Sequence, residues 1–211
     1  MTMHKQLFSA TLSVAVAFAF ASVATAQIEL ATNGDFETGD VSGWDVSFLT
    51  GSQSFGPTGF VAGGATAGEL VNPDQGTGGV IKQANIGIGV VSPGQEITIS
   101  FDAAGNFGVG GVAFAELFSE VDGGGTSASE ILSGGPLALT SSYQPFSFTA
   151  LAGPDVSGGI TLQFNAATGA VAGSTAQLFI DNVSVSVIPE PATVTMMALA
   201  GVGACFLRRR R

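Results

Sequence analysis

The chain has 211 residues and is acidic: six basic residues against sixteen acidic ones give a formal net charge of −10 at pH 7. Five of the six basic residues lie near the two ends, so residues 27–188 carry only Lys82 against fifteen acids, a formal charge of −14. Such a segment excludes nucleic acid and an anionic membrane face as partners, because binding to phosphates depends on lysine and arginine side chains that displace counterions.

The residue types that are missing restrict the chemistry further. His4 and Cys205 are the only histidine and cysteine, and both lie near the ends of the chain. Residues 27–188 therefore contain no histidine-activated nucleophile, no zinc site of the usual nitrogen and sulfur ligands, and no disulfide. Catalysis would have to use carboxylates, Lys82 or Tyr143, so we predict that the protein is not an enzyme.

The first 26 residues have the order of a secretory signal peptide. A short basic start precedes an apolar run over residues 7–21, and Ala24 and Ala26 are the small residues at the positions that signal peptidase reads. We therefore predict a signal peptide helix over residues 1–26 and a mature chain that begins at Gln27. An uncleaved N-terminal anchor is the alternative.

Short runs of alternating polar and apolar residues follow, and this pattern predicts β-strands. In chain order the predicted strands cover residues 44–49, 78–88, 96–102, 112–121, 144–149, 160–165 and 179–187. The alternation is most regular over 96–102, 160–165 and 179–187. Each of these strands can bury one face and leave the other in solvent.

The composition of residues 27–188 favours two packed sheets. Glycine makes up about 18% of this segment, against a usual ~7%, and glycine-rich stretches such as 105–111, 123–125 and 166–174 are predicted end loops. No long stretch has apolar residues at helical spacing. We predict one all-β domain over residues 27–188, a two-sheet antiparallel β-sandwich with jelly-roll connections. A right-handed β-helix is the alternative, but no coil motif of constant length repeats.

The last 23 residues, 189–211, have a distinct pattern. Pro189, Glu190 and Pro191 begin it, and seventeen uncharged residues separate Glu190 from the arginines at the end. This length is near the ~17-residue lower limit for crossing the hydrocarbon of a bilayer, so we predict a transmembrane helix. The arginine cluster favours a cytoplasmic position for the last residues. These arginines are Arg208, Arg209, Arg210 and Arg211.

The order of Pro-Glu-Pro, a short apolar helix and an arginine cluster resembles the PEP-CTERM sorting signal of Gram-negative bacteria. The resemblance implies handling by an exosortase, a membrane enzyme that cleaves near Pro-Glu-Pro. It also implies export, a transient hold in the inner membrane through the C-terminal helix, and a final place on the cell surface or in the extracellular matrix. A single-span anchor that is never cut is the alternative.

Three motifs within residues 27–188 resemble the galactose-binding-like β-sandwiches, which include several carbohydrate-binding modules. The first is Asn33-Gly34-Asp35-Phe36-Glu37, followed by Gly43-Trp44. The second, Ser92 to Phe101, lies in the middle of the segment, and the third, Ile180 to Val185, lies at its end. The resemblance supports the sandwich fold and implies that the first and last motifs lie side by side.

A structural calcium ion is implied by the same resemblance. Its carboxylate ligands would carry over to Glu37 and Asp181, with backbone oxygens around residues 33–35. Two neighbouring carboxylates require a raised pKa or a cation between them, and calcium accepts six to eight oxygen ligands. The alternative is that Glu37 is a solvated residue and Asp181 a turn or edge residue.

Sugar-binding sites combine exposed aromatic faces with amides and carboxylates that hydrogen-bond hydroxyls. Tyr143 is our candidate for such an aromatic residue, with Asn106, Gln163 and Asn165 as candidate polar partners. Trp44 begins a strand in the resembling family, so we expect it in the core.

Three functions remain open at this stage. The first is a non-catalytic module of the exopolysaccharide or biofilm matrix that binds a glycan, with exosortase and signal peptidase as processing partners. The second is a structural or adhesive surface protein without a glycan site. The third is a carboxylate-based glycosidase or lyase, although no spacing singles out a catalytic pair. Its candidate carboxylates are Glu69, Glu96, Glu116, Glu120 and Glu130.

Overall fold

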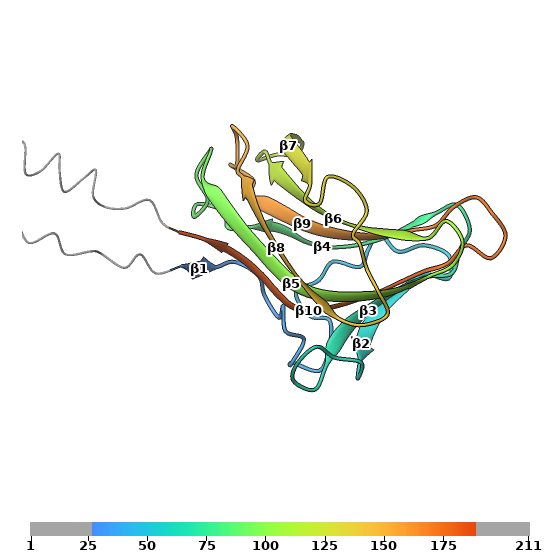
Figure 1. Ribbon diagram of the computed structural model, residues 1–211. Coiled ribbons are helices and arrows are strands. Elements are labelled where there is room, and N and C mark those ends of the chain that lie inside the picture. Colours follow the sequence, from blue (N-terminus) through green and yellow to red (C-terminus); the bar gives the residue numbers. More distant parts are fainter. Residues whose placement is uncertain (1–26, 189–211) are drawn as a thin grey trace, which may run out of the picture.

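Ten strands in two stacked sheets form the part of the chain that the computed structural model describes, residues 27–188 (Figure 1). The strands are β1 (Ile28–Glu29), β2 (Ser54–Thr58), β3 (Ala67–Asn72), β4 (Gly78–Ile86), β5 (Glu96–Phe107), β6 (Val112–Glu120), β7 (Thr126–Ile131), β8 (Gln144–Leu151), β9 (Ile160–Ala167) and β10 (Ala176–Val187). No helix is present within these residues, and none of them therefore belongs to a helix long and apolar enough to cross a membrane.

The two sheets are antiparallel and differ in size. The six-stranded sheet has the order β2-β3-β10-β5-β8, with β1 paired to β10, and the four-stranded sheet has the order β4-β9-β6-β7. From β3 to β6 and again from β7 to β10, each connection crosses from one sheet to the other. This alternation is the jelly-roll topology, so the prediction of an all-β, two-sheet sandwich is confirmed.

Most of the predicted strands are present, with shifted ends. The runs that begin at residues 78, 96, 112, 144 and 160 are β4, β5, β6, β8 and β9. The predicted strand over 44–49 is wrong: this segment forms turns, and only Asp45 makes an isolated bridge to Lys82. The predicted loop over 105–111 begins later, because residues 105–107 belong to β5.

The core lies between the sheets and is centred on aromatic side chains. Phe36 and Trp44 are buried and stack with their ring centroids 5.6 Å apart, and Trp44 also packs on Phe164. The indole N–H of Trp44 donates to the carbonyl of Asn33. The expected core position of Trp44 is therefore confirmed.

A bulge in β10 joins the first and last motifs. Asn182 has a φ of 51°, a left-handed conformation that asparagine tolerates better than most residues. The pairing of β10 with β5 shifts between Asp181 and Ser184, and the freed N–H of Val183 donates to the carbonyl of Gly34 at 2.8 Å. The terminal strands also pair, so the two ends of the described chain leave the sandwich side by side (Figure 1).

Several predictions concern residues outside the described range. These are the signal peptide over residues 1–26, the transmembrane helix, the sorting motif at Pro189, Glu190 and Pro191, and the arginine cluster. The cleavage site beside Gln27 and the domain boundaries stay predictions as well.

Candidate functional site

The outer face of the four-stranded sheet combines aromatic and polar side chains. Along β6, Ala113, Ala115 and Leu117 point into the core, so Phe114, Glu116 and Phe118 point out on the opposite face. Both phenylalanines are only partly buried and belong to no core contact among the described residues. A strand thus presents two apolar rings to solvent with a carboxylate between them.

A polar row crosses this face at the level of Glu116. Lys82 on β4 is the register partner of Gln163 on β9, and Gln163 is the partner of Glu116 on β6. The side-chain amide of Gln163 donates to Glu116 Oε2 at 2.8 Å. The row therefore places a cation, an amide and a carboxylate on three adjacent strands, with Phe114 and Phe118 on either side of it.

A hydrogen-bond acceptor and a third aromatic ring lie beside the polar row. The carbonyl oxygen of the Asn165 side chain is buried and accepts no hydrogen bond from the described residues. Asn165 is the register partner of Phe114, so this acceptor lies next to one of the two partly buried rings. From the segment before β2, Phe48 approaches Lys82, whose Nζ lies 4.1 Å from the centre of the phenyl ring.

A hollow lies at one end of this face, where β4 and β6 continue into the surrounding loops. This hollow of about 450 Å³ is lined by Lys82 and Thr161 from the face itself, and by Asn85, Glu120 and Asp122 at its rim. Its lining is mostly polar and offers both hydrogen-bond donors and acceptors. The hollow and the face together form the candidate site, which we call the β4-β9-β6 face.

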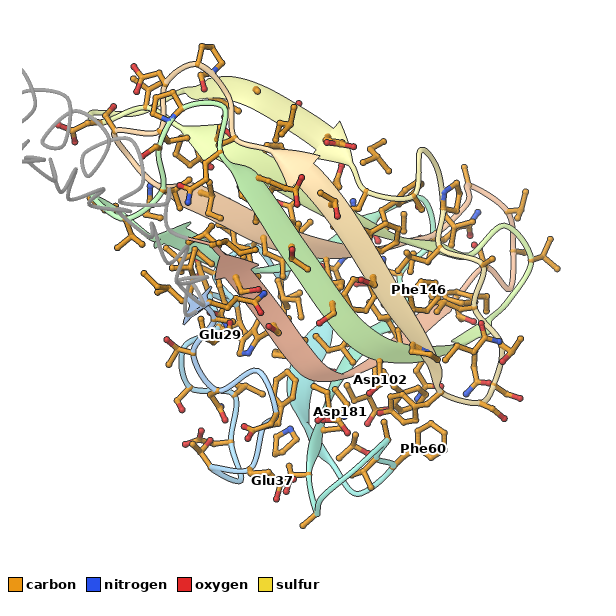
Figure 2. All side chains as sticks on the ribbon, turned by 60° about the vertical axis from the view of Figure 1, so that its left-hand side comes forward. Glu29, Glu37, Phe60, Asp102, Phe146 and Asp181 are labelled. Atoms are coloured by element: carbon orange, nitrogen blue, oxygen red, sulfur yellow. The ribbon has the colours of Figure 1, made fainter. Side chains whose placement is uncertain are left out.

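The predicted metal ligands Glu37 and Asp181 lie elsewhere, on the outer side of the six-stranded sheet. Asp181 is almost fully buried, and its Oδ2 accepts hydrogen bonds from the amides of Ala62 and Gly63 at 2.9 and 3.1 Å. Glu37 Oε1 accepts from the amides of Ala65 and Thr66 at 2.8 and 2.9 Å. Both carboxylates are thus brought to one segment, residues 59–66, between β2 and β3 (Figure 2).

The hydrogen bonds that Thr66 and Ala65 donate lower the pKa of Glu37 below its ordinary value. This favours the ionised form, because an amide N–H stabilises a carboxylate more than a carboxylic acid. The negative charges of Glu37 and Asp181 therefore hold residues 62–66 against the sandwich, a role that the sequence did not indicate.

The donor set at these two acids is compatible with calcium in its chemistry. Carboxylate and carbonyl oxygens are the ligands calcium prefers, and Glu37 Oε2 has no hydrogen-bond partner among residues 27–188. Within the same range no group of three or more His, Cys, Asp or Glu side chains could hold a metal ion. Backbone oxygens would have to supply most of the ligands, and the calcium site stays a prediction.

Tyr143, the predicted ligand-binding aromatic residue, contacts the same 59–66 segment. Its hydroxyl donates to the carbonyl of Phe60 at 2.8 Å, and the two rings stack with centroids 5.0 Å apart. Burial raises the pKa of Tyr143 above its ordinary value, and the nearby charges of Asp181 and Asp102 act in the same direction. The phenol therefore stays protonated and is already used within the fold.

The predicted polar partners are divided between the two sheets. Asn106 lies on the six-stranded sheet, where its amide donates to Gln177 beside a hollow of about 440 Å³. Gln163 and Asn165 lie on the β4-β9-β6 face. The sequence did not place Phe114 or Phe118 in a site. The one available signal was the alternation of β6, in which both phenylalanines share a face with Glu116.

The comparisons with known proteins concern the two parts of the chain separately. Residues 187–211 match the PEP-CTERM protein-sorting motif. No curated protein was found to match the sequence. The C-terminal prediction is therefore confirmed as a motif, and the relatives of the sandwich are visible only through its structure.

Solved structures similar to this chain include two carbohydrate-binding modules. One is the CBM22-1 xylan-binding domain of Paenibacillus barcinonensis Xyn10C, with a TM-score of 0.54, 11% sequence identity and coverage of 77% of this chain and 94% of that one. Another is a family 16 carbohydrate-binding module-2, with a TM-score of 0.50, 13% identity and coverage of 74% and 98%.

A third similar structure is the enzymatically active domain of bacteriophage CBA120 tailspike protein 4. The TM-score is 0.59 and the identity 18%, and the match covers 76% of this chain but spans only 22% of the tailspike chain. All three structures are similar to this chain in fold. The chain therefore carries a PEP-CTERM sorting motif at its C-terminus behind a β-sandwich with the fold of carbohydrate-binding modules.

Proposed function

We propose that this protein is an exported, non-catalytic module that binds a polysaccharide in the exopolysaccharide or biofilm matrix of a Gram-negative bacterium. The sorting motif supports export and handling by an exosortase, with signal peptidase acting at the other end. The fold supports the choice of ligand class, since one structural neighbour is a xylan-binding domain.

The observation that carries the proposal is the β4-β9-β6 face. Phe114 and Phe118 lie four residues apart on one strand, which separates them by about 13 Å. Lys82, Gln163 and Glu116 cross the strip between them. A pyranose offers an apolar face to a phenyl ring and a rim of hydroxyls to amides and charges. An extended chain of sugar units therefore matches both features of this face.

The geometry of the same face disfavours hydrolysis. Glu116 and Glu120 are the two glutamates that β6 presents outward, and four residues along a strand separate their Cα atoms by about 13 Å. Glycosidases hold their two catalytic carboxyls about 5–9.5 Å apart, so both side chains would have to lean toward each other, whereas Glu120 accepts a hydrogen bond from Thr126 on the neighbouring strand. Glu116 also accepts a hydrogen bond from Gln163, which fits a binding role.

A structural calcium ion at Glu37 and Asp181 is part of the proposal. It would stabilise residues 59–66 and would take no part in ligand binding, because Asp181 lies on β10 of the six-stranded sheet and Glu37 in the turns between β1 and β2, both away from the β4-β9-β6 face. Tyr143 is retained as a second, separate ligand residue on the six-stranded sheet.

Affinity electrophoresis of the purified protein through gels that contain soluble polysaccharides, xylan and bacterial exopolysaccharide among them, tests the proposal. We expect retardation by at least one polysaccharide, and its loss in the double variant Phe114→Ala, Phe118→Ala. Val109→Ala, which truncates an exposed side chain in the turn after β5, is the matched control and should be retarded like the wild type.

Tyr143→Ala separates the two candidate surfaces. Loss of retardation in this variant alone would move the site to the six-stranded sheet. Absence of retardation by every polysaccharide, together with calcium-dependent association of the protein, would replace the proposal with the structural or adhesive function.

A further inference from the structure

The end of the sandwich from which the chain continues toward the sorting motif is unusually apolar. Eleven large apolar side chains are exposed within residues 27–188, and five of them gather at this end. They are Ile28, Ile88, Val90, Leu151 and Ile188. We call this group the exit surface.

The strand pairing places these residues together. Ile28 on β1 is the register partner of Val187, the last residue of β10. Leu151 on β8 is the partner of Glu96, the first residue of β5, and the side chain of Gln95 donates to the carbonyl of Ile188 at 3.0 Å. The starts of β1 and β5 and the ends of β8 and β10 therefore form one rim (Figure 1).

The segment between β4 and β5 completes the rim. Val90 and Val91 both donate backbone hydrogen bonds to Gly87, and a Cβ at Gly87 would lie 2.9 Å from Leu30 Cδ1, beside β1. Val91 turns into the core, which leaves Val90 and Ile88 exposed at 41% and 58%.

The charged groups at this end of the sandwich are acids. The carboxylate of Glu29 (Figure 2) is held by hydrogen bonds, which it accepts from the amides of Val185 and Ala31 and from the hydroxyl of Ser184. Glu96 lies at the rim itself, and Asp155 follows Leu151 in the loop between β8 and β9. Glu120 and Asp122 line the hollow beside Ile88, together with Lys82. Lys82 is the one base within residues 27–188, and it lies in this hollow beside the acids and not on the rim. Attraction to anionic headgroups therefore cannot hold the rim to a membrane, and apolar contact is the remaining means.

The length of chain beyond the fold identifies the occupant. Val187 is buried and Ile188 is the last described residue, so folded structure reaches to within four residues of Ala192, after which the sequence stays uncharged to Leu207. Four residues span at most about 14 Å. Once the uncharged run is in a bilayer, the exit surface is held at the level of the lipid headgroups.

We propose that the exit surface docks on the bilayer by inserting its aliphatic side chains between lipid headgroups, so that the sandwich rests on the membrane until the sorting motif is processed. Exposed aliphatic side chains lower their free energy when they leave water for the boundary between headgroups and acyl chains, where anchored apolar surfaces lie about 5–10 Å deep. The tether adds to this, because it makes docking intramolecular and gives the surface a high effective concentration at the membrane. The inference rests on the sorting motif and not on glycan binding.

Depth-dependent fluorescence quenching in phosphatidylcholine vesicles tests the docking. The full chain is reconstituted with Cys205 replaced by Ser, and a single cysteine at Leu151→Cys carries an environment-sensitive dye. The matched control is Val109→Cys, which is 72% exposed in the turn after β5, at the opposite end of the sandwich. Lipids spin-labelled near the headgroup should quench the dye at 151 several-fold more than the dye at 109.

Equal, weak quenching at both positions would overturn the proposal. A blue-shifted emission at 151 without quenching by the spin-labelled lipids would also overturn it, because it would place a second copy of the protein on the exit surface. Val90→Asp should reduce the quenching at 151, and unchanged quenching in this variant would contradict insertion of the rim. The emission of the buried Trp44 reports that each variant is folded, and Ile88→Cys replaces Leu151→Cys if that variant is not.

Discussion

Replacement of Asp181 by alanine provides the most direct test of how the fold is held together. Asp181 is 1% exposed and accepts three backbone hydrogen bonds, from Ala62, Gly63 and its neighbour Asn182. The alanine variant leaves all three amides without an acceptor. It also releases residues 59–66 from the bulge in β10.

The expected loss of stability follows from these three bonds. Each buried hydrogen bond to a charged acceptor contributes about 1.5–3 kcal/mol to stability. In the variant the amides of the 59–66 segment regain part of this by bonding to water. The expected loss of stability is therefore about 1 kcal/mol for each bond and about 3 kcal/mol in total. For a domain of this size a loss of 1 kcal/mol lowers the melting temperature by about 2–4 °C. We expect Asp181→Ala to melt about 6–12 °C below the wild type.

Thermal unfolding followed by circular dichroism at pH 7, in the presence of a chelator, measures this difference. Asp122→Ala is the matched control, since it removes the same charge from an exposed turn where the carboxylate has no hydrogen-bond partner within residues 27–188. Equal melting temperatures for the two variants would refute the view that Asp181 fastens the 59–66 segment.

Four further predictions concern other parts of the structure. Amide hydrogen bonds lower the pKa of Glu37, so the stability that the Glu37 carboxylate provides is complete above the ordinary glutamate pKa and is lost as the pH falls through the lowered value. The difference in unfolding free energy between pH 7 and pH 3 should therefore be smaller for Glu37→Gln than for the wild type. Addition of calcium should raise the melting temperature of the wild type but not of Asp181→Ala, and an equal rise in both would place the ion elsewhere. Gly34→Ala should destabilise the protein by about 1–3 kcal/mol in chemical unfolding, because its Cβ would run into the backbone of Val183. Trp44→Ala should cost about 3–5 kcal/mol by the same measurement, and a cost below 1 kcal/mol would contradict a core position.

The sequence predicted the strands that carry a clear two-residue period. Residues 96–102 and 160–165 lie in β5 and β9 because their inward positions, such as Ile97, Ile99 and Leu162, are large and apolar. Alternation of this kind depends only on neighbouring residues, so it can be read without knowing the partner strand.

Strand β3 was not predicted, and the reason lies in its partners. Its inward positions include Gly68 and Asn72 beside Leu70. A Cβ at Gly68 would lie 2.8 Å from the rings of Phe36 and Phe55, so the glycine makes room for distant aromatic side chains. The buried position of Asn72 is tolerated because its amide donates a hydrogen bond to the carbonyl of Ala166 at 2.8 Å. Neither requirement is visible within the strand itself.

The candidate site was predicted less completely than the fold. The sequence suggested Gln163 and Asn165 as ligand residues, and Lys82 and Glu116 only as isolated charges. They form one row because β4, β9 and β6 pair in a particular register, and the bonds that set this register join residues more than 40 positions apart. Tyr143 was chosen as an aromatic residue that could stack on a sugar, and in the structure its hydroxyl donates a hydrogen bond to the carbonyl of Phe60.

The place of β10 within the sheet governs the order in which this protein can fold. β10 is the last strand of the chain, yet it pairs with β1, β3 and β5 and so forms the middle of the six-stranded sheet. In a chain that is made or exported from its N-terminus, the earlier strands emerge without the partner that joins them, and the six-stranded sheet cannot close until β10 has followed. The sorting motif follows at once. Closure of the six-stranded sheet is therefore the last step of folding, and it depends on the segment that directly precedes the sorting motif.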